Sequence, residues 1–304
     1  MSKNKKVAII TGVTSFLGRS TAKYLLGKGF VVLGIVRPDS LNIGNLKSID
    51  GLNIIKLDFE KLSSSDFKNL QEVSDDNIEI LDTIKNIKSK NVDLTFIHYA
   101  WGHTLDRNNF AKQMMNIDTS LKVLEFAKIL NADRFIFAGS QAEKSETAYG
   151  MAKKQFSIKA ISDLKMNKMQ FIHFLIFSIY GREDRETSML KQLVQSFKDN
   201  RDFSLSSCEY KWNFLYIDDY VDILYKFIIN DVKSGNYDIA SDDTRDLKEY
   251  VKEAYSVYGA KNKLLFGDMP DSSETFAIPN IKNTIDVIGE YSFTKFSKGI
   301  ESLK

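Results

Sequence analysis

Six short runs of β-branched and aromatic residues recur along residues 7–177, and longer segments with helical periodicity separate them. Runs that are apolar throughout fit strands buried on both faces, and amphipathic helices between them fit a parallel sheet with helices on both sides. We therefore predict a doubly wound α/β fold. The expected strands are 7–10, 31–36, 53–57, 93–100, 134–140 and 171–177, and the expected helices include 18–26, 110–130 and 148–164.

A glycine-containing turn, residues 11–18 (TGVTSFLG), follows the first expected strand and leads into a helix. Gly12 permits a tight turn, and Gly18 allows the helix to pack closely on the strand. The small residues Thr14 and Ser15 let backbone amides approach a pyrophosphate, which the N–H groups and partial positive charge of the helix N-terminus attract. Ser15 stands where the usual pattern has its middle glycine, so a plain strand-to-helix turn is the alternative. The position after the first strand favours a Rossmann-type dinucleotide site.

Charged residues after the second and third expected strands indicate which dinucleotide binds. Arg37 comes first after the second strand, and a guanidinium is a good bidentate partner for the 2′-phosphate of NADP. Asp39 keeps NAD open, because an acidic residue in this region binds a ribose 2′-hydroxyl. Asp58, after the third strand, either accepts a hydrogen bond from the adenine amino group or caps the strand end. We predict NADP as the cofactor, with NAD as the alternative.

Tyr149 and Lys153 are the most informative pair in the sequence. At a spacing of four they share one helix face, where the ammonium favours the ionised phenol and makes Tyr149 a usable proton donor or acceptor near neutral pH. The Y-x-x-x-K pattern alone is common and also fits a solvated helix face. Here it comes nine residues after Ser140, at the end of the fifth expected strand. Together with the N-terminal turn, this arrangement predicts an active site.

Further motifs extend this pattern along nearly the whole chain. They are TGVTSFLG (11–18), Asp58, FIHYAWG (96–102), NIDTSLKVLEFA (116–127), FAGSQAE (137–143), YGMAK (149–153), FSIYG (177–181), WNFLYIDD (212–219) and GNYDIAS (235–241). In this order and spacing they resemble the extended short-chain dehydrogenases/reductases that act on nucleotide sugars. Each motif is weak alone, and the set is specific.

The resemblance implies a role for each matching position. Ser140 would orient the substrate carbonyl, Tyr149 would be the acid/base, and Lys153 would hold the nicotinamide ribose. The predicted cofactor-binding residues are Gly12, Thr14, Ser15, Phe16, Leu17, Arg37, Asp58, Phe59, Tyr99, Ala100, Trp101, Asn116, Tyr149, Lys153, Phe177 and Ile179. The predicted substrate-binding residues are Trp101, Gln141, Ser178 and Trp212. Because family members commonly dimerise through the two helices that carry Asn116 and Tyr149, a homodimer is also expected.

The residues after Ser140 indicate the reaction. Dehydratases that resemble this family place an Asp-Glu pair after the corresponding residue, because water elimination needs its own acid and base. Gln141 and Ala142 occupy those positions here, so 4,6-dehydration is not expected. The phrases HYAWG, AGSQAE and WNFLYIDD resemble the branch with nucleotide-linked 4-keto-6-deoxyhexose reductases, in which Tyr is common at the position of Lys144. We predict NAD(P)H-dependent reduction of the 4-keto group of a nucleotide-linked (deoxy)hexose.

Two other functions stay open. A nucleotide-sugar 4-epimerase is disfavoured by Ser178, where epimerases often have Asn, and by Arg37, because family epimerases typically retain NAD. A non-catalytic dinucleotide-binding sensor could use the same fold. The complete set of Ser140, Tyr149 and Lys153 argues against a sensor, which has no need of a proton donor.

The alternation of apolar runs and helices ends near residue 178, which suggests a second part of the chain. Residues 220–230 look helical and are expected to return to the first part. The predicted domains are a dinucleotide-binding domain of residues 1–178 with 212–234 returning to it, and a nucleotide-sugar-binding lobe of residues 179–211 and 235–304. The 60–91 connection is long and polar, with an amphipathic segment near 78–87, and is interpreted as an insertion.

Composition argues against several kinds of partner and against a membrane or secreted location. Lys and Arg number 42 against 40 Asp and Glu, so the chain lacks the basic excess that is typical of nucleic-acid-binding proteins. The most apolar stretch, 171–180, is about half as long as a membrane span, and the N-terminus does not fit a signal peptide. One cysteine and three histidines allow no disulfide and give little material for a metal site. We expect a cytoplasmic, metal-free protein with a small-molecule nucleotide-sugar partner.

Overall fold

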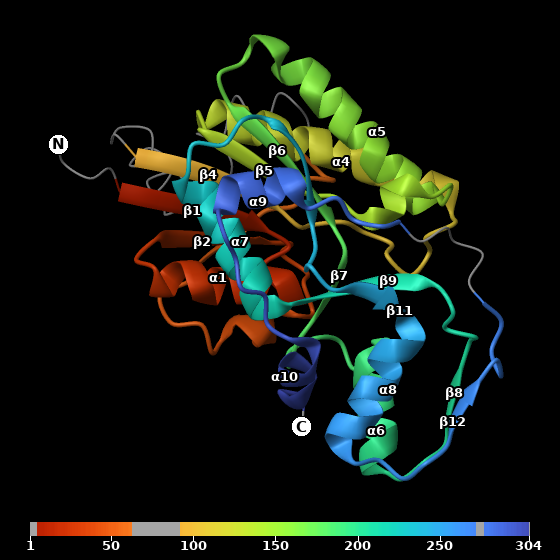
Figure 1. The fold of residues 1–304 in the computed structure, drawn as a ribbon. Coiled ribbons are helices and arrows are strands. Elements are labelled where there is room, and N and C mark those ends of the chain that lie inside the picture. The colour runs from red at the N-terminus through yellow and green to blue at the C-terminus, as the bar shows by residue number, and fades with distance from the viewer. Residues whose placement is uncertain (1–4, 63–91, 272–276, 304) are drawn as a thin grey trace. The chain divides into compact units, whose positions relative to one another are not determined.

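The computed structural model describes residues 5–62, 92–271 and 277–303, and Figure 1 shows its path. The expected amphipathic segment near 78–87 lies outside the described residues. The main sheet contains β1 (Lys5–Thr11), β2 (Val31–Val36), β3 (Asn53–Lys56), β4 (Val92–His98), β5 (Arg134–Ala138), β6 (Gln170–Ile176) and β10 (Gly235–Ile239). The smaller sheets contain β7 (Ser178–Tyr180), β8 (Phe203–Leu205), β9 (Lys211–Tyr216), β11 (Thr244–Asp246) and β12 (Leu264–Phe266).

The predicted helices at 18–26, 110–130 and 148–164 correspond to α1, α4 and α5. The α-helices are α1 (Phe16–Gly27), α4 (Phe110–Ile129), α5 (Ala148–Asp163), α6 (Met189–Lys198), α7 (Ile217–Ile229), α8 (Leu247–Tyr258), α9 (Lys282–Ile288) and α10 (Phe296–Glu301). The 3₁₀-helices are η1 (Ile43–Leu46), η3 (Gln141–Lys144) and η4 (Leu164–Met166). Within the described ranges, every helix is too short or too polar to cross a membrane.

The chain divides into two compact units, each built from separated stretches of sequence. Unit 1 comprises Met1–Gly139, Met151–Phe174 and Val232–Asn236, and unit 2 comprises Ser140–Gly150, Leu175–Asp231 and Tyr237–Lys304. Residues 212–231, which the predicted domains joined to the first part, cluster with unit 2. The assignment of a ligand to each domain stays a prediction.

The main sheet has seven strands in the order β10-β6-β5-β4-β1-β2-β3. The neighbouring pairs from β3 to β6 are all parallel. The order reverses at β1, which has β2 on one side and β4 on the other, so the loops after β1 and β4 meet at a switch point where ligands bind in such folds. This topology confirms the predicted doubly wound α/β fold. β10, which was expected in the substrate lobe, forms the seventh strand beside β6.

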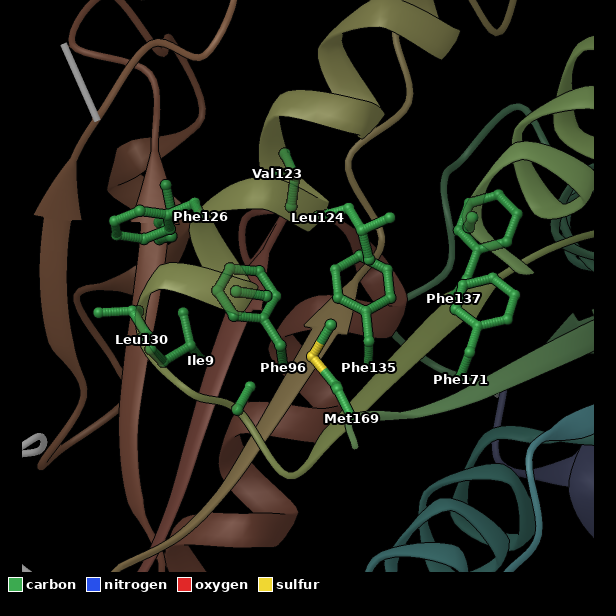
Figure 2. Packing of buried hydrophobic residues seen from close by; sticks show 14 of the residues in the cluster. Ile9, Phe96, Val123, Leu124, Phe126, Leu130, Phe135, Phe137, Met169 and Phe171 are labelled. Carbon is green, nitrogen blue, oxygen red and sulfur yellow. The ribbon is translucent and has the colours of Figure 1, made fainter. Parts of the chain in front are cut away.

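Aromatic side chains from neighbouring strands build the core on one face of the sheet (Figure 2). Phe135 stacks on Phe96 at 5.7 Å and on Phe171 at 6.0 Å, because strand neighbours in register present their side chains on the same face. α4 and α5 cover this face, and α1 lies on the opposite side of the strands (Figure 1). Met115 of α4, although apolar, is 56% exposed.

Unit 2 has its own core, in which α6, α8 and α10 pack against the small sheets. The three-stranded sheet has the order β11-β9-β7, and β12 pairs with β8. Phe296 of α10 contacts Tyr250 of α8 at 4.8 Å and Phe214 of β9 at 5.6 Å. These contacts anchor the C-terminal helix to the strand that follows the predicted substrate residue Trp212.

Candidate active site

The turn after β1 has the close backbone approaches that its glycines permit. Gly12 has φ of +68°, a conformation that side chains disfavour, and a Cβ there would lie 2.7 Å from the backbone nitrogen of Ala100. A Cβ at Gly18 would lie 2.4 Å from the carbonyl oxygen of Gly12. The start of α1 therefore lies directly against the turn, and the turn lies against the segment after β4.

Ser15, which replaces the usual middle glycine, is the N-cap of α1. Its Oγ accepts a hydrogen bond from the Gly18 N–H at 3.1 Å, and its own N–H donates to the Gly12 carbonyl at 3.0 Å. Arg19 donates to the Thr14 carbonyl at 2.7 Å and fixes the turn from the other side. The departure from the glycine pattern thus preserves the helix N-terminus. This cradle of close backbone and N–H groups fits the diphosphate of a dinucleotide.

Arg37 and Asp58 follow the neighbouring parallel strands β2 and β3, so both lie at the same edge of the sheet. Arg37 is exposed. Asp58 Oδ1 accepts from the Glu60 N–H at 3.1 Å, and its Oδ2 lies 3.4 Å from the Lys61 ammonium. Asp58 therefore has the capping contact that was the alternative to adenine binding. Phe59 is buried and packs edge-on against Phe126 of α4 at 5.7 Å.

The segment after β4 is held by α4. Asn116, which is 8% exposed, accepts from the Gly102 N–H at 2.7 Å and donates to the Gly102 carbonyl at 3.1 Å. Trp101 Nε1 donates to Gln113 Oε1 at 3.0 Å. The Tyr99 hydroxyl shares a hydrogen bond of 2.8 Å with Thr21 of α1. Asn116 therefore shapes the backbone beside the glycine turn.

His98 is a buried neutral histidine at the end of β4. Its ring shares hydrogen bonds with Thr11 Oγ1 at 2.7 Å and with Ser120 Oγ at 2.9 Å. Burial, and then the positive charge of Lys153, lower the pKa of His98 from 6.5 to about 3. This bonding gives His98 a structural role, because it ties the end of β4 to β1 and α4. In the described part of the chain, no group of three or more His, Cys, Asp or Glu side chains is arranged to hold a metal ion.

Lys153 is a buried cation in α5. Its side chain is 4% exposed, its ammonium donates to the Ala138 carbonyl at the end of β5, and it lies 4.8 Å from the Trp101 ring centroid. A buried ammonium needs such partners, because its desolvation is costly. Tyr149 lies one turn earlier on the same helix, in the arrangement that the sequence spacing predicted.

Ser140 begins the 3₁₀-helix η3 in unit 2. Its Oγ accepts from the Ala142 N–H at 3.2 Å, and its own N–H donates to the Glu143 carboxylate at 2.9 Å. This is a capping box, which satisfies two backbone N–H groups reciprocally. Glu143 is 7% exposed, so its carboxylate is buried in this cap. The same bonding holds the Ser140 side chain in place.

Gly150 brings the first turn of α5 against η3. A Cβ at Gly150 would lie 1.9 Å from the carbonyl oxygen of Ala142 and 3.1 Å from Thr147 Oγ1. No side chain other than hydrogen fits this contact. Because Tyr149 precedes Gly150 directly, the contact fixes where Tyr149 stands relative to the turn that begins at Ser140.

The predicted substrate residues divide between the units. In unit 2, Gln141 Nε2 donates to Ser178 Oγ at 3.4 Å, so these two lie together. Trp212 is half-buried in the core of unit 2. Two predicted cofactor residues flank Ser178: Phe177, just before β7, is buried, and Ile179, within β7, is half-buried. Trp101 belongs to unit 1, beside Lys153.

Three residues that position the predicted groups were missed from the sequence: Gln113, Glu143 and Gly150. Ser140 to Glu143 reads S-x-x-E, the capping-box pattern, so Glu143 could have been found. Gln113 and Gly150 act through contacts that local patterns do not encode.

The sequence pattern of the NAD dependent epimerase/dehydratase family matches residues 8–240. The chain belongs to this family. The match includes the glycine turn, the Ser140 turn, α5 and the end of β10, and it confirms the resemblance drawn from the motifs. The protein is therefore an NAD(P)-dependent, oxidoreductase-type enzyme that acts on nucleotide sugars.

Curated relatives match this chain over nearly its whole length or over about three quarters of it. CDP-abequose synthase of Salmonella muenchen is 24% identical over 318 residues, which cover 99% of this chain and 98% of that protein. Its counterpart in Yersinia pseudotuberculosis is 26% identical over 76% of this chain and 75% of its own.

Solved structures of similar proteins show the same fold. The UDP-N-acetylglucosamine 4-epimerase of Methanobrevibacter ruminantium, in complex with UDP-N-acetylmuramic acid, matches with a TM-score of 0.79 at 17% identity, over 99% of this chain and 97% of that one. The Bordetella bronchiseptica enzyme WbmG, in complex with NAD and UDP, matches with a TM-score of 0.77 at 15% identity, over 97% and 93%.

Proposed function

We propose that this enzyme reduces the 4-keto group of a nucleotide-linked deoxyhexose with NADPH. The bound dinucleotide supplies the hydride, and the chain's own residues orient the ketone and deliver the proton. Full-length similarity to CDP-abequose synthases supports a nucleotide-sugar substrate and puts CDP-linked sugars first.

The observation that carries this proposal is that the Glu143 carboxylate, which bonds to the Ser140 N–H, is buried. Gln141 and Ala142 follow Ser140 and cannot act as acid and base, and the Glu143 carboxylate is buried as the acceptor of the Ser140 N–H. Elimination of water needs an acid and a base at the sugar. Because this turn offers neither, carbonyl reduction is favoured over dehydration.

Ser140 and Tyr149 act on the substrate oxygen. Because Ser140 Oγ accepts from the Ala142 N–H, its own O–H can be donated to the substrate carbonyl, where negative charge develops. Tyr149 protonates the resulting alkoxide as general acid. Lys153, one turn along α5, favours transfer of the phenolic proton through its positive charge and contacts the nicotinamide ribose.

The cofactor residues in this proposal are those that the sequence predicted. The turn from Gly12 to Leu17 holds the diphosphate, and its tight backbone approach fits that group. Arg37 pairs with the 2′-phosphate of NADP, and its exposed position after β2 supports this choice. Asp58, Phe59, Tyr99, Ala100, Trp101, Asn116, Phe177 and Ile179 complete the proposed cofactor set. NAD in place of NADP is the alternative that the experiments below test.

Gln141 and Ser178 are the proposed sugar contacts, and their mutual hydrogen bond supports placing them together. Trp101 and Trp212 are the proposed aromatic contacts to the sugar or nucleotide. Both side chains are half-buried: each packs partly against the core of its own unit and keeps a partly exposed surface that could contact a ligand.

The test mixes the full-length protein with NADPH and a panel of CDP-, dTDP-, GDP- and UDP-linked 4-keto deoxyhexoses. We expect stoichiometric NADPH oxidation and a 4-hydroxyl product with one of them, measured by absorbance and mass spectrometry. Inversion of a 4-hydroxyl sugar without net NADPH oxidation would instead identify a 4-epimerase. Identification of the dinucleotide that copurifies separates the two functions independently.

The matched control is Tyr149→Phe, which removes only the hydroxyl. We expect nearly all turnover to be lost while NADPH binding, measured by fluorescence titration, is retained. A variant with full turnover would contradict the acid role. Tight NADPH binding by wild type, without hydride transfer to any sugar, would support a sensor.

A homodimer through α4 and α5 is part of the proposal. Met151, Ile158 and Ile161 share one face of α5 and are 43%, 53% and 44% exposed. We expect Ile158→Glu to convert a dimer to a monomer in light scattering, whereas Leu41→Glu, at a 98% exposed loop position, leaves the mass unchanged. A cytoplasmic location stays a prediction.

A further inference from the structure

Asp238 of β10 is a buried carboxylate at which three segments of unit 2 meet. The residue is 8% exposed. Its Oδ2 accepts from the Lys144 ammonium at 2.9 Å and from the Asn280 N–H at 2.8 Å. Its backbone carbonyl accepts from Thr284 Oγ1 at 2.8 Å. One residue therefore joins η3, β10 and the segment 280–284.

Lys144 is the last residue of η3, the turn that begins with Ser140 as its cap. Its ammonium also lies 5.4 Å from the ring centroid of Phe177. At the other end of the same turn, Gln141 donates to Ser178 Oγ at 3.4 Å. The turn is thus held at both ends by side chains that reach other strands.

These contacts close a ring within unit 2. The Phe177 N–H donates to the Ile239 carbonyl at 3.1 Å, so the residues next to Ser178 and Asp238 are themselves bonded. The path runs from Gln141 to the start of β7, across to the end of β10, and back through Asp238 to Lys144. A closed ring restricts a short turn more than either contact alone, because movement must break two contacts.

In the Lys144–Asp238 ion pair, the carboxylate is more deeply buried than the ammonium. The Asp238 side chain is 9% exposed and that of Lys144 is 36% exposed. A buried carboxylate needs a cation and hydrogen bonds, and loss of its partner leaves an uncompensated buried charge. Lys144, by contrast, can turn its ammonium into water when Asp238 is neutralised. The pair therefore predicts a larger effect from the loss of Lys144 than from the loss of the negative charge on Asp238.

We propose that the Lys144–Asp238 ion pair positions the turn that begins at Ser140 and couples it to the segment 280–284. Lys144 is a positioning residue, which acts on the reaction through Ser140 and Gln141. The catalytic part of this inference rests on the proposed function, in which Ser140 orients the substrate carbonyl. The coupling of the two segments does not depend on which reaction the enzyme catalyses.

Four variants of the full-length protein test the pair. Asp238→Asn keeps the shape and removes the charge, Lys144→Met leaves the buried carboxylate without its cation, and Lys144→Arg keeps the positive charge. Glu209→Gln is the control, because Glu209 also belongs to an ion pair of unit 2, with Lys248 at 2.8 Å, and both partners of that pair lie outside η3. For each, kcat, KM and the deuterium uptake of peptides covering 139–147 and 277–284 are measured, the uptake without substrate.

We expect Asp238→Asn to raise amide exchange in residues 140–145, and Lys144→Met to raise it in residues 280–284 as well. A misplaced catalytic group costs about 100-fold in rate. For both Asp238→Asn and Lys144→Met we therefore expect kcat to fall by about 10- to 100-fold, while KM for NADPH is unchanged. Lys144→Arg should restore most of kcat, and Glu209→Gln should match wild type.

The outcomes separate the two proposals. Unchanged exchange in both peptides for Asp238→Asn overturns the coupling, and this variant serves even if Lys144→Met fails to fold. Raised exchange with wild-type kcat overturns the positioning role. If the wild-type protein reduces no keto sugar but the variants still show raised amide exchange, the coupling is supported and the proposed function is contradicted.

Discussion

Gly150 lies so close to Ala142 that a methyl group at residue 150 would stand 1.9 Å from the Ala142 carbonyl oxygen. The contact joins the first turn of α5 to the 3₁₀-turn capped by Ser140. Because Gly150 is packed against the backbone of Ala142, the contact also sets the position of the preceding residue, Tyr149. The obstacle is a carbonyl group of the main chain, which cannot rotate aside as a flexible side chain could.

Gly150→Ala should therefore destabilise the fold and lower turnover together. Overpacking against backbone costs about 3 kcal/mol, and we expect a loss of this size in urea unfolding. Gly27→Ala is the control, because a Cβ at Gly27 meets nothing within 4 Å. Equal stability of the two variants would show that the α5 contact is not tight.

Ser140 has two functions that substitution can separate. Ser140→Ala removes both the cap and the hydroxyl, so it should cost about 1 kcal/mol of stability and about 100-fold in kcat. Ser140→Asn keeps a good cap acceptor and lacks the hydroxyl, so it should keep stability and still lose turnover. An active Asn variant would mean that Ser140 serves only as a cap.

His98 should make the fold sensitive to acid. Because burial and Lys153 lower its pKa to about 3 while the unfolded chain keeps 6.5, the unfolded state binds the proton first. Its contribution to stability is complete above pH 6.5 and is lost as pH falls toward 3. Between pH 7.5 and 5.0 this loss is about 2 kcal/mol.

The measurement is urea unfolding of wild type and His98→Gln at both pH values. The variant cannot take up this proton. Between pH 7.5 and 5.0 its free energy of unfolding should therefore fall by about 2 kcal/mol less than that of wild type. His103→Gln, in an exposed loop, should behave as wild type. Parallel pH profiles for wild type and His98→Gln would refute the assignment.

Arg37 should set the preference for NADPH. Loss of a charge-assisted contact costs about 1.5–3 kcal/mol, so Arg37→Ala should lower the ratio of kcat/KM for NADPH to that for NADH by about 10- to 100-fold. Lys56→Ala, at an exposed position on the neighbouring strand, is the control. An unchanged ratio would favour NAD as the native cofactor.

Local patterns in the sequence were sufficient to predict six of the seven strands of the main sheet and the helices α1, α4 and α5. Buried parallel strands are apolar on both faces, so their runs stand out, and helices α1, α4 and α5 follow at the expected positions. The same patterns placed Gly12 and Gly18 at a turn with the close approaches that the structure contains. Secondary structure with a strong period is encoded within a few residues.

Contacts between distant segments were not predictable in this way. Lys144 and Asp238 are 94 residues apart, and neither position has a feature that indicates the other. Phe59 follows the predicted adenine contact Asp58, and its side chain packs in the core against Phe126 of α4, a contact with a residue 67 positions away along the chain. Met115 fits the helical period but faces outward, since a period does not determine which face a sheet covers.

The place of β10 at the sheet edge has a consequence for synthesis on the ribosome. β6 ends at Ile176, and β10 begins at Gly235, so about 60 residues must be translated before β6 gains its neighbour. At about 5–20 residues per second this takes several seconds. During that interval the apolar β6 is an open edge that can pair with another chain. Nascent chains of this enzyme therefore have a period of aggregation risk, which a chaperone that covers sheet edges would shorten.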